Sequence, residues 1–444
     1  MKKIFAFLLS LMLAVSLLIG CAQNAKSVAA STVPSATASE KKEIVTLSLL
    51  MFTDWWNNSG WEDVVNDVNA RAEELGYRVE VEKIAGGDQG NQIVKSRFAS
   101  GETPDMLLYH NANSAVIDLG DSFMDISGKW TANYDQDMVN SKNCTINGKV
   151  VGVPANAVTL DGMYYNEKVF QDVGVEIPTN WDEFLVVCEK IKATGVTPVY
   201  FSGKDAWTLQ LMPNDGFERA ARDGKSMTEI LEEINEGKSK YSDQTFFMDT
   251  MDKMLVLKSK GYINETYLSD TYDAAQTALV EGKAAMYSMA SWLSTELEKK
   301  YPGKTDHIGA FPTPFEGDEK VPAWGSRAML VPADCKHPEQ AKAFVEYIGS
   351  KEGQQVFFTH MSGIPLMDGI TSNASRAEQD LMNYAAERGK ISIWSDLVKY
   401  NYGSFDKYCQ DLLVGAKTSL QVAEEMDKET YKNAKAKGDT NFVD

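Results

Sequence analysis

Aromatic and amide residues gather at the end of one short apolar run and could bind a small molecule. Tyr109, His110, Asn111 and Asn113 stand at or just after the end of residues 105–109. Flat rings can stack on a ligand face, while amides both donate and accept hydrogen bonds. This mixture suits a neutral, hydroxyl-rich ligand better than an ion. The alternative is a polar turn in which the Asn side chains bind their own backbone.

Tryptophans follow other apolar runs in the same way. Trp55 and Trp56 come directly after the run 44–52, in a polar segment where core packing explains a tryptophan pair poorly. One of the two could still serve only to close the loop. Trp207 and Trp292 each follow a later predicted strand, at 198–201 and 284–289 respectively. We therefore expect several rings at strand ends, where open α/β sheets bind their ligands.

The elements that would position the first group alternate regularly. Two amphipathic helices separate three apolar runs of strand length, which predicts a parallel sheet. In such a sheet the tryptophan pair and Tyr109 lie at the same edge. The predicted elements are a strand at 44–52, a helix at 61–75, a strand at 77–84, a helix at 90–100 and a strand at 105–109.

Length and composition indicate a large globular protein. A chain of 444 residues is too long for one ordinary core, so two domains are expected. Apolar residues make up 43% of the sequence, and the mean hydropathy is -0.30. The net charge of -19 argues against nucleic acid and anionic membrane surfaces as partners.

Cysteine and histidine usage argues against a metal site and against a disulfide framework. No pair of cysteines has Cys-x-x-Cys spacing, and the histidines are dispersed along the chain. We expect neither a metal nor another cofactor. Four cysteines in core-like contexts are predicted to be free buried thiols, namely Cys144, Cys188, Cys335 and Cys409.

The N-terminus has the features of a secretion signal. Lys2 and Lys3 precede the apolar run 4–19, which is typical of a signal peptide and short for a membrane span. The run ends in Leu-Ile-Gly-Cys21, which resembles a bacterial lipobox whose cysteine is acylated. The alternative is an ordinary signal peptide with a chance cysteine. The aperiodic stretch 22–43 is predicted to be a flexible tether.

A series of further motifs follows along the chain in a fixed order. The motifs are Ser100-Gly-Glu-Thr-Pro-Asp105, Gly148-Lys-Val-Val-Gly-Val-Pro154, Tyr165-Asn-Glu-Lys-Val-Phe170, Pro178-Thr-Asn-Trp-Asp-Glu-Phe184, 278–286 with Ser291-Trp292, Ile308-Gly-Ala-Phe-Pro-Thr-Pro314, 337–354 and Gly363-Ile-Pro365. Together and in this order they resemble the family 1 extracellular solute-binding proteins of bacterial ABC importers, which are carbohydrate receptors related to maltose-binding protein.

The resemblance implies a fold and a domain map. The fold would be α/β and periplasmic-binding-protein-like, with two lobes, an interlobe ligand cleft and a hinge that the chain crosses near 153–154, 324–327 and 365. The implied division is a signal peptide at 1–20, a lipidated cysteine and tether at 21–43, an N-terminal lobe at 44–154 plus 326–364, and a C-terminal lobe at 155–325 plus 365–444.

The resemblance also suggests roles for residues beyond the first lobe. Trp207 and Trp292 would stack on the ligand, and Asp205 would accept hydrogen bonds from its hydroxyls. Trp324 and Arg327, at the hinge, could complete the cleft, although the arginine could instead pair with a carboxylate across the hinge. Core packing is the alternative for each tryptophan.

Two details qualify the resemblance. Trp181 belongs to a motif that begins a packing helix, so we expect it to be structural. After Tyr109 the chain has Asn111 and then Ala112, where maltose-binding protein carries an aspartate. This departure leaves the identity of the sugar open.

The implied function is a receptor that captures a carbohydrate and delivers it to the permease subunits of an ABC transporter. It would be a monomeric lipoprotein at the outer face of the bacterial cytoplasmic membrane, without enzyme activity. One alternative is a secreted glycoside hydrolase, which needs two suitably spaced carboxylates. Another is the same receptor with a peptide, polyamine or metal as cargo.

Overall fold

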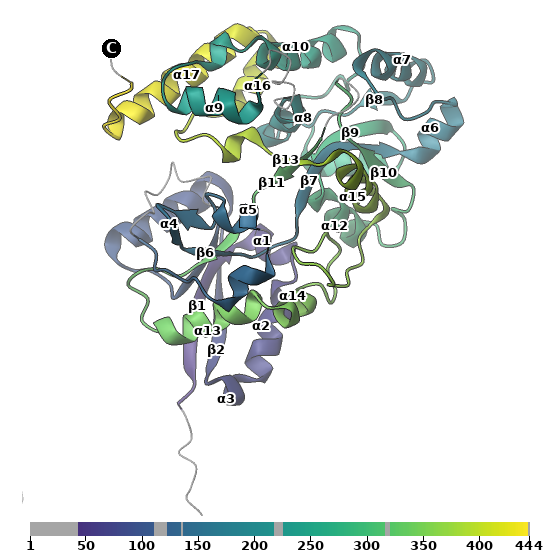
Figure 1. Cartoon of the computed structure of the whole chain (residues 1–444). Coiled ribbons are helices and arrows are strands. Elements are labelled where there is room, and N and C mark those ends of the chain that lie inside the picture. Colours follow the sequence, from purple (N-terminus) through teal and green to yellow (C-terminus); the bar gives the residue numbers. More distant parts are fainter. Residues whose placement is uncertain (1–42, 111–121, 135, 217–224, 316–319, 443–444) are drawn as a thin grey trace, which may run out of the picture. The chain divides into compact units, whose positions relative to one another are not determined.

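A computed structural model describes residues 43–110, 122–134, 136–216, 225–315 and 320–442 (Figure 1). Residues from Glu43 onward form one compact unit that contains two larger β-sheets. Each of these sheets packs against helices through its own hydrophobic core. No helix within the described residues has both the length and the apolar character needed to cross a membrane.

The first sheet has five strands in the order β2-β1-β3-β12-β6. Its first three strands are parallel, which confirms the arrangement predicted from the alternation of strands and helices. The strand β12 arrives from much later in the chain and runs antiparallel to β3 and β6. The strands are β1 (Val45–Phe52), β2 (Tyr77–Ile84), β3 (Met106–Tyr109), β6 (Gly152–Pro154) and β12 (Ala328–Leu330), with a separate hairpin of β4 (Thr145–Ile146) and β5 (Lys149–Val150).

Helices cover this sheet, and together they form what we call the first lobe. In α2 the residues Trp61, Val64 and Val68 are buried on one face, as expected for an amphipathic helix. The helix predicted at 61–75 is interrupted at Arg71, whose φ of -102° and ψ of 16° are not helical. The tryptophan pair lies in a short helix rather than a loop. The helices are α1 (Thr53–Asn57), α2 (Trp61–Ala70), α3 (Ala72–Leu75), α4 (Gly87–Ser100), η2 (Lys129–Asn133), α5 (Gln136–Asn140), α13 (Pro338–Ile348) and α14 (Lys351–Phe357).

The second sheet has the order β13-β11-β7-β9-β8, with β10 also paired to β7. The strand directions in this sheet are mixed. Strand β7 is antiparallel to its three partners β9, β10 and β11, while β8 and β9 are parallel to each other. All residues of 284–290 in β9 are buried, which accounts for the small and mostly apolar residues there. The strands are β7 (Thr159–Asn166), β8 (Thr197–Val199), β9 (Ala284–Ala290), β10 (Ile308–Phe311), β11 (Val321–Trp324) and β13 (Lys390–Ser392).

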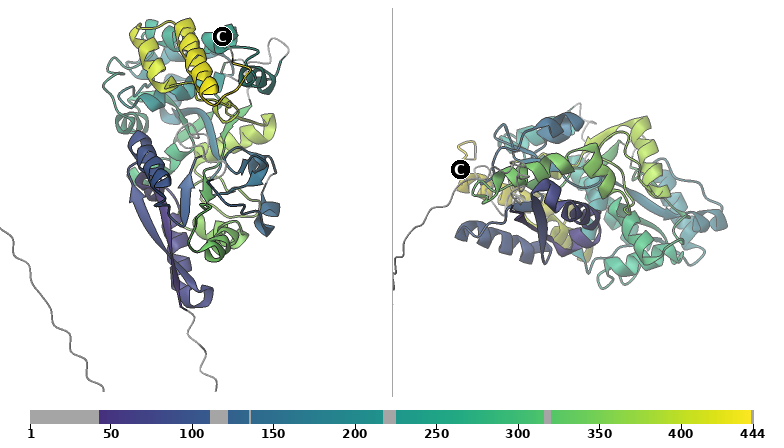
Figure 2. Two further views of the ribbon diagram at one scale, coloured as in Figure 1. Left: turned by 90° about the vertical axis from the view of Figure 1, so that its left-hand side faces the viewer. Right: turned by 90° about the horizontal axis from the view of Figure 1, so that it is seen from below.

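The second lobe consists of this sheet and its helices. The C-terminal helices α16 and α17 pack on α10, which is far earlier in the chain, and Figure 2 shows them in yellow. The helices are α6 (Glu167–Val173), α7 (Trp181–Lys192), η3 (Ala206–Gln210), α8 (Leu211–Asp215), α9 (Met227–Asn235), η5 (Tyr241–Asp243), α10 (Thr245–Ser259), α11 (Tyr272–Val280), α12 (Trp292–Lys300), α15 (Arg376–Arg388), η6 (Trp394–Asp396), α16 (Phe405–Val414) and α17 (Ser419–Ala436).

The chain passes between the two sheets three times, close to the three positions that the family resemblance implied. The first two connecting segments are hydrogen-bonded to each other. The Asn156 Oδ1 atom accepts from the Ser326 hydroxyl at 2.6 Å and from the Arg327 N–H at 2.8 Å. The Val158 N–H donates to the Ile364 carbonyl in the third segment at 2.8 Å. The three connecting segments are residues 155–158, 325–327 and 358–375.

The four cysteines of the described residues are free thiols, as predicted. Cys144, Cys188 and Cys409 are buried, but Cys335 is only half-buried, so the prediction of a buried thiol is wrong at this position. Burial raises the pKa of the Cys144 thiol to about 12 and that of Cys335 to about 11. These thiols therefore stay protonated and unreactive at neutral pH.

Trp181 is a packing residue of the second lobe, as expected. It opens α7, and its ring stacks near Phe315 at a centroid distance of 6.1 Å and near Phe184 at 5.3 Å. The Asn180 side chain caps the same helix by accepting from the Glu183 N–H. The ring therefore covers the first turn of a helix that contributes to the second core.

We predict that Trp181→Ala destabilises the protein by about 2 kcal/mol, because a half-buried ring gives up part of the 3–5 kcal/mol lost when a fully buried tryptophan is truncated. Thermal unfolding followed by circular dichroism should show the lower melting temperature. Val186→Ala, on an exposed position of the same helix, is the control and should change little. Equal melting temperatures for the Trp181 variant and the wild type would contradict the packing role.

Candidate functional site

Three of the predicted tryptophans form a continuous row on the second lobe. Trp207 and Trp292 have ring centroids 6.2 Å apart, and Trp292 and Trp324 are 5.8 Å apart. Trp207 comes after β8 and Trp292 after β9, as predicted from the sequence, and Trp324 is the last residue of β11. Trp207 is 36% exposed, and the other two rings are half-buried. The row therefore presents aromatic surface that is only partly covered by protein.

A tyrosine that sequence reasoning missed extends this row. Tyr272, the first residue of α11, lies edge-on to Trp207 at 5.0 Å. Its backbone N–H donates to the Asp205 Oδ2 atom at 2.8 Å, so the predicted acceptor Asp205 also holds the start of this helix beside the row. No sequence signal distinguished Tyr272, because only the fold brings it next to Trp207.

The third tryptophan is fixed by a buried acid. The Trp324 Nε1–H donates to the Asp161 Oδ1 atom at 2.5 Å. Asp161 lies on β7 and is 1% exposed. Burial and the neighbouring Asp215 carboxyl raise its pKa well above the ordinary value. This carboxyl group was not among the candidate residues, and it sets the orientation of the ring.

The first lobe contributes a tryptophan stacked with an arginine. The Arg327 guanidinium lies 4.5 Å from the centroid of the Trp55 ring, a cation–π contact. Trp55 is half-buried and also packs on Phe52, with ring centroids 4.4 Å apart. Trp56 has a different environment, because Lys83 of β2 lies 5.1 Å from its ring. Of the predicted pair, Trp55 is the ring that lies beside Arg327.

Tyr109 is completely buried and lies behind Trp55. Its ring is 6.4 Å from the Trp55 ring and 6.0 Å from Phe52. Its hydroxyl donates to the Asn91 Oδ1 atom at 2.6 Å, and burial raises its pKa. In this structure Tyr109 supports Trp55 from the core of the first lobe.

Arg327 is an enclosed cation that forms no ion pair with another described residue. Its guanidinium makes no hydrogen bond or salt bridge to any residue that the structure describes. Burial lowers its pKa to about 10, and the Glu296 carboxylate of the second lobe partly opposes that shift. Glu296 therefore acts on Arg327 without an ion pair between these two side chains.

Glu296 is the acid that faces this cation from the second lobe. It lies one helical turn after Trp292 on α12 and accepts hydrogen bonds from Gln276 at 3.0 Å and from Asn58 at 3.3 Å. Burial raises its pKa. Because Asn58 follows α1 on the first lobe, this contact joins the two lobes beside the aromatic residues. The i, i+4 spacing from Trp292 is a signal by which sequence reasoning could have found it.

His110 lies at the second connecting segment. Its Nε2 atom is 3.3 Å from the Gly325 carbonyl oxygen, and burial lowers its pKa while Asp396 partly opposes that effect. The Gly325 N–H donates to the Asp396 Oδ2 atom at 2.6 Å. A Cβ atom on Gly325 would lie only 2.4 Å from the Asn143 Nδ2 atom. The predicted residues Asn111 and Asn113 lie outside the described residues.

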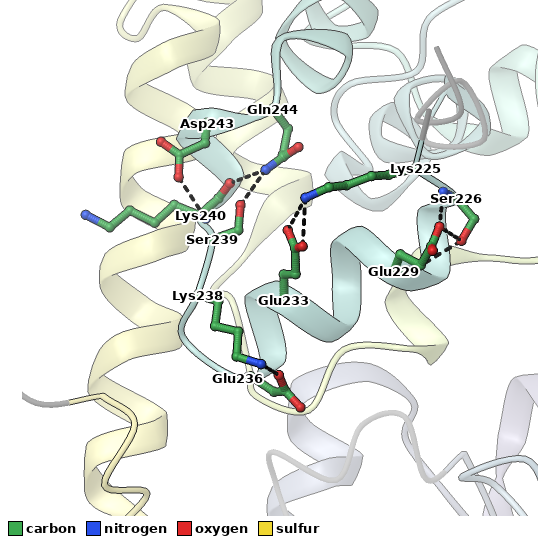
Figure 3. Close-up of polar contacts among 10 residues, drawn as sticks. All are labelled: Lys225, Ser226, Glu229, Glu233, Glu236, Lys238, Ser239, Lys240, Asp243 and Gln244. Carbon is green, nitrogen blue, oxygen red and sulfur yellow. Dashed lines mark hydrogen bonds and ion pairs between the residues drawn. The ribbon is translucent and has the colours of Figure 1, made fainter. Parts of the chain in front are cut away.

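A cavity of about 330 Å³ adjoins this glycine. Its wall combines first-lobe residues around Lys142 with Asp396 and with α9 of the second lobe. Figure 3 shows how α9 is held. The Ser226 hydroxyl accepts from the Glu229 N–H at 3.2 Å, and Lys225 pairs with Glu233 at 2.7 Å. These contacts stabilise the N-terminal end of α9, which lines the cavity.

The geometry brings most of the predicted residues to two groups. One is the row Trp207, Trp292 and Trp324, with Asp205 beside it, and the other is Trp55 with Arg327 in front of Tyr109. Within the described residues no three His, Cys, Asp or Glu side chains are grouped as a metal site requires. The arrangement offers flat apolar faces together with donors and acceptors, which suits a ligand with both apolar faces and hydroxyl groups.

Comparisons with known proteins agree with this architecture. Residues 56–355 match the family described as bacterial extracellular solute-binding protein. A multiple sugar-binding protein of Streptococcus mutans is 25% identical over 296 residues, which are 66% of this chain and 70% of the relative.

Solved structures show the same fold. A chitin oligosaccharide binding protein superposes with a TM-score of 0.71 at 23% identity, covering 88% of this chain and 99% of that one. A sugar transporter protein from Bacillus licheniformis in complex with stachyose has a TM-score of 0.68 at 21% identity, covering 87% and 99%. The α/β fold predicted for this chain, with two lobes and a hinge of several crossings, is confirmed.

Proposed function

Because the chain belongs to the bacterial extracellular solute-binding protein family, we propose that it captures an oligosaccharide outside the cytoplasm and delivers it to the permease of an ABC transporter. The family and its relatives are binding proteins, and several relatives carry sugar binding in their names. The observation that carries the proposal is the row of three tryptophans on one lobe with the Trp55–Arg327 pair on the other.

The chemistry of these side chains favours a sugar over other cargo. A pyranose ring has apolar faces that stack on tryptophan, and its hydroxyls both donate and accept hydrogen bonds. Arg327 supplies donors, and the carboxylates of Asp205 and Glu296 supply acceptors. A polyamine would meet the enclosed positive charge of Arg327, and a peptide would not need so many flat rings.

Closure of the lobes is part of the proposal. We assign residues 44–154 plus 326–364 to one moving body and 155–325 plus 365–444 to the other, with the three connecting segments as the hinge. Arg327 lies in one of these segments, so closure brings it and Trp55 toward the tryptophan row. The ligand is then held from both sides. The protein acts as a monomer, which light scattering of the purified protein checks by its molar mass.

We predict binding without turnover. Stachyose, raffinose and chitin oligosaccharides are tested by thermal shift. A ligand that binds only the folded state stabilises it, by about 2.7 kcal/mol when the ligand concentration is 100 times Kd, and therefore raises the melting temperature. Peptide and polyamine mixtures are the comparison. Stabilisation by these and by no sugar would refute the sugar assignment. Chromatography after incubation should return the bound sugar intact, and cleavage products would instead indicate a hydrolase.

A second prediction concerns the tryptophan row. Trp292→Ala should weaken the best sugar by about 30- to 1,000-fold, since the loss of a stacked ring at a binding hot spot costs roughly 2–4 kcal/mol. Calorimetry measures the affinity. Trp181→Ala, which removes a ring outside the site, is the matched control and should bind normally. An unchanged affinity with a large drop in melting temperature would make Trp292 a packing residue.

We also propose that the mature protein begins at an acylated Cys21 and is anchored to the outer face of the membrane. Acyl chains contribute about 0.8 kcal/mol per buried CH2, so a multiply acylated cysteine gives firm attachment. Cys21→Ala should move the protein to the soluble fraction and abolish labelling by a radioactive fatty acid. Ser27→Ala is the control. Membrane retention of the Cys21 variant, with no label on the wild type, would refute the anchor.

A further inference from the structure

Helix α12 of the second lobe contacts the connecting segments and the first lobe along the same face that carries Trp292. The residues of this face are Ser291, Trp292, Thr295, Glu296 and Lys299, and their spacing places them on one side of a helix. Trp292 is the central ring of the tryptophan row. One helix therefore links the hinge, the aromatic residues and the opposite lobe.

Two residues of this face hold α12 to the connecting segments. The Ser291 hydroxyl donates to the Val158 carbonyl oxygen at 3.3 Å and accepts from the Leu160 N–H at 3.2 Å. One turn later, the Thr295 hydroxyl donates to the Ser362 carbonyl oxygen at 3.3 Å. Helix α12 is thus hydrogen-bonded to the first and the third connecting segments.

The following turns of α12 reach the C-terminal end of α1 on the first lobe. The Glu296 carboxylate accepts from the Asn58 amide at 3.3 Å, and its other oxygen accepts from Gln276 of α11 at 3.0 Å. The Lys299 ammonium group donates to the Asn57 carbonyl oxygen. A cationic donor suits this position, because the last carbonyl groups of a helix have no partner within the helix. We call the Asn58–Glu296 and Asn57–Lys299 hydrogen bonds the α1–α12 clasp.

The charges around the clasp come from both lobes. Partial burial lowers the pKa of Lys299, and the carboxylates of Glu296 and of Glu62 on α2 oppose that shift. Burial raises the pKa of Glu296, and the like charge of Asp54 on α1 raises it further. The ammonium group therefore offsets the repulsion between acids that face one another from the two lobes.

Helix α1 is fixed to the rest of the first lobe. The Thr53 hydroxyl at its start donates to the Ile84 carbonyl oxygen of β2 at 3.0 Å. In the turn between α1 and α2, a Cβ atom on Gly60 would lie 1.7 Å from the Phe357 carbonyl oxygen, so this turn packs directly on α14. A contact at the end of α1 therefore acts on the whole lobe, including the Trp55 ring that α1 carries.

We propose that the α1–α12 clasp holds the two lobes closed before a ligand binds. In doing so it positions the Trp55 ring of α1 and the Trp292 ring of α12 on the two sides of the sugar. The first part stands on the contacts between the two helices, and the second part rests on the proposed function. A ligand binds more weakly when the competent arrangement is only partly populated. Loss of the clasp therefore weakens sugar binding without removing a sugar contact.

The substitution Lys299→Glu tests the clasp without any sugar. It places a carboxylate against the Asn57 carbonyl oxygen and the neighbouring acids, so small-angle X-ray scattering should give a larger radius of gyration than for the wild type. Lys300→Glu is the matched control, because it changes the net charge equally and Lys300 pairs with Asp273 within the second lobe. Its radius should equal that of the wild type. Equal radii for Lys299→Glu and the wild type would overturn the clasp.

A reversal of donor and acceptor tests the other hydrogen bond and covers the case in which Lys299→Glu does not fold. Asn58→Asp replaces the donor by a second carboxylate beside Glu296, so the radius should again increase. Adding Glu296→Gln restores a donor at this contact, while the new amide oxygen can still accept from Gln276. The double variant should regain the wild-type radius. A radius as large as that of Asn58→Asp alone would overturn this pairing.

The positioning role is tested with the sugar that binds best among stachyose, raffinose and a chitin oligosaccharide. Calorimetry should show that Lys299→Glu weakens binding by about tenfold, or about 1.4 kcal/mol, while Lys300→Glu binds like the wild type. Stopped-flow tryptophan fluorescence should show the loss mainly as faster dissociation. An expanded Lys299→Glu variant with wild-type affinity would overturn the positioning role and leave the clasp supported.

The outcomes separate this inference from the proposed function. Absence of binding by every sugar would refute the proposed function, while the scattering measurements on the sugar-free protein would still decide the clasp. Unchanged radii in both Lys299→Glu and Asn58→Asp would overturn the clasp even if the wild type binds a sugar tightly.

Discussion

The architecture depends on the hydrogen bonds that one amide side chain makes between two crossings of the chain. Asn156 lies in the first connecting segment, and its Oδ1 atom accepts from both Ser326 and Arg327 of the second segment. The two segments are consequently held to each other side by side. The Arg327 backbone N–H makes one of these hydrogen bonds, and Trp324 lies three residues before Arg327. The orientation of both groups is thus tied to the same short stretch of backbone.

The candidate site contains a cation, Arg327, and an acid, Glu296, that lie near each other without forming an ion pair. Glu296 influences Arg327 electrostatically but is hydrogen-bonded to Asn58 and Gln276, while the guanidinium is stacked on Trp55. A direct pair would have used up these donors and acceptors. Keeping them apart in an enclosed region costs free energy, as the lowered pKa of the arginine shows. Under the proposed function, a ligand with hydroxyl groups between them would recover part of that cost.

Much of the fold could be predicted because its signals are local. The alternation of apolar strands with amphipathic helices located β1, β2 and β3 to within a residue or two. The tryptophan row was also foreseeable, since Trp207 and Trp292 each follow a buried strand. Contacts between distant residues were not foreseeable from pattern alone. Asp161 and Asn156 are polar residues in unremarkable surroundings, and only the packing of strands far apart in the sequence gives them their partners.

The lobes approach closely at Gly325 because this residue has no Cβ atom. A Cβ placed there would meet the Asn143 amide of the first lobe at 2.4 Å and the Asp396 carboxylate of the second at 2.9 Å. Only a hydrogen atom fits on this α-carbon between the two groups. A methyl group there would push Asn143 and Asp396, and with them the two lobes, apart. The close approach of the lobes at this crossing therefore requires glycine.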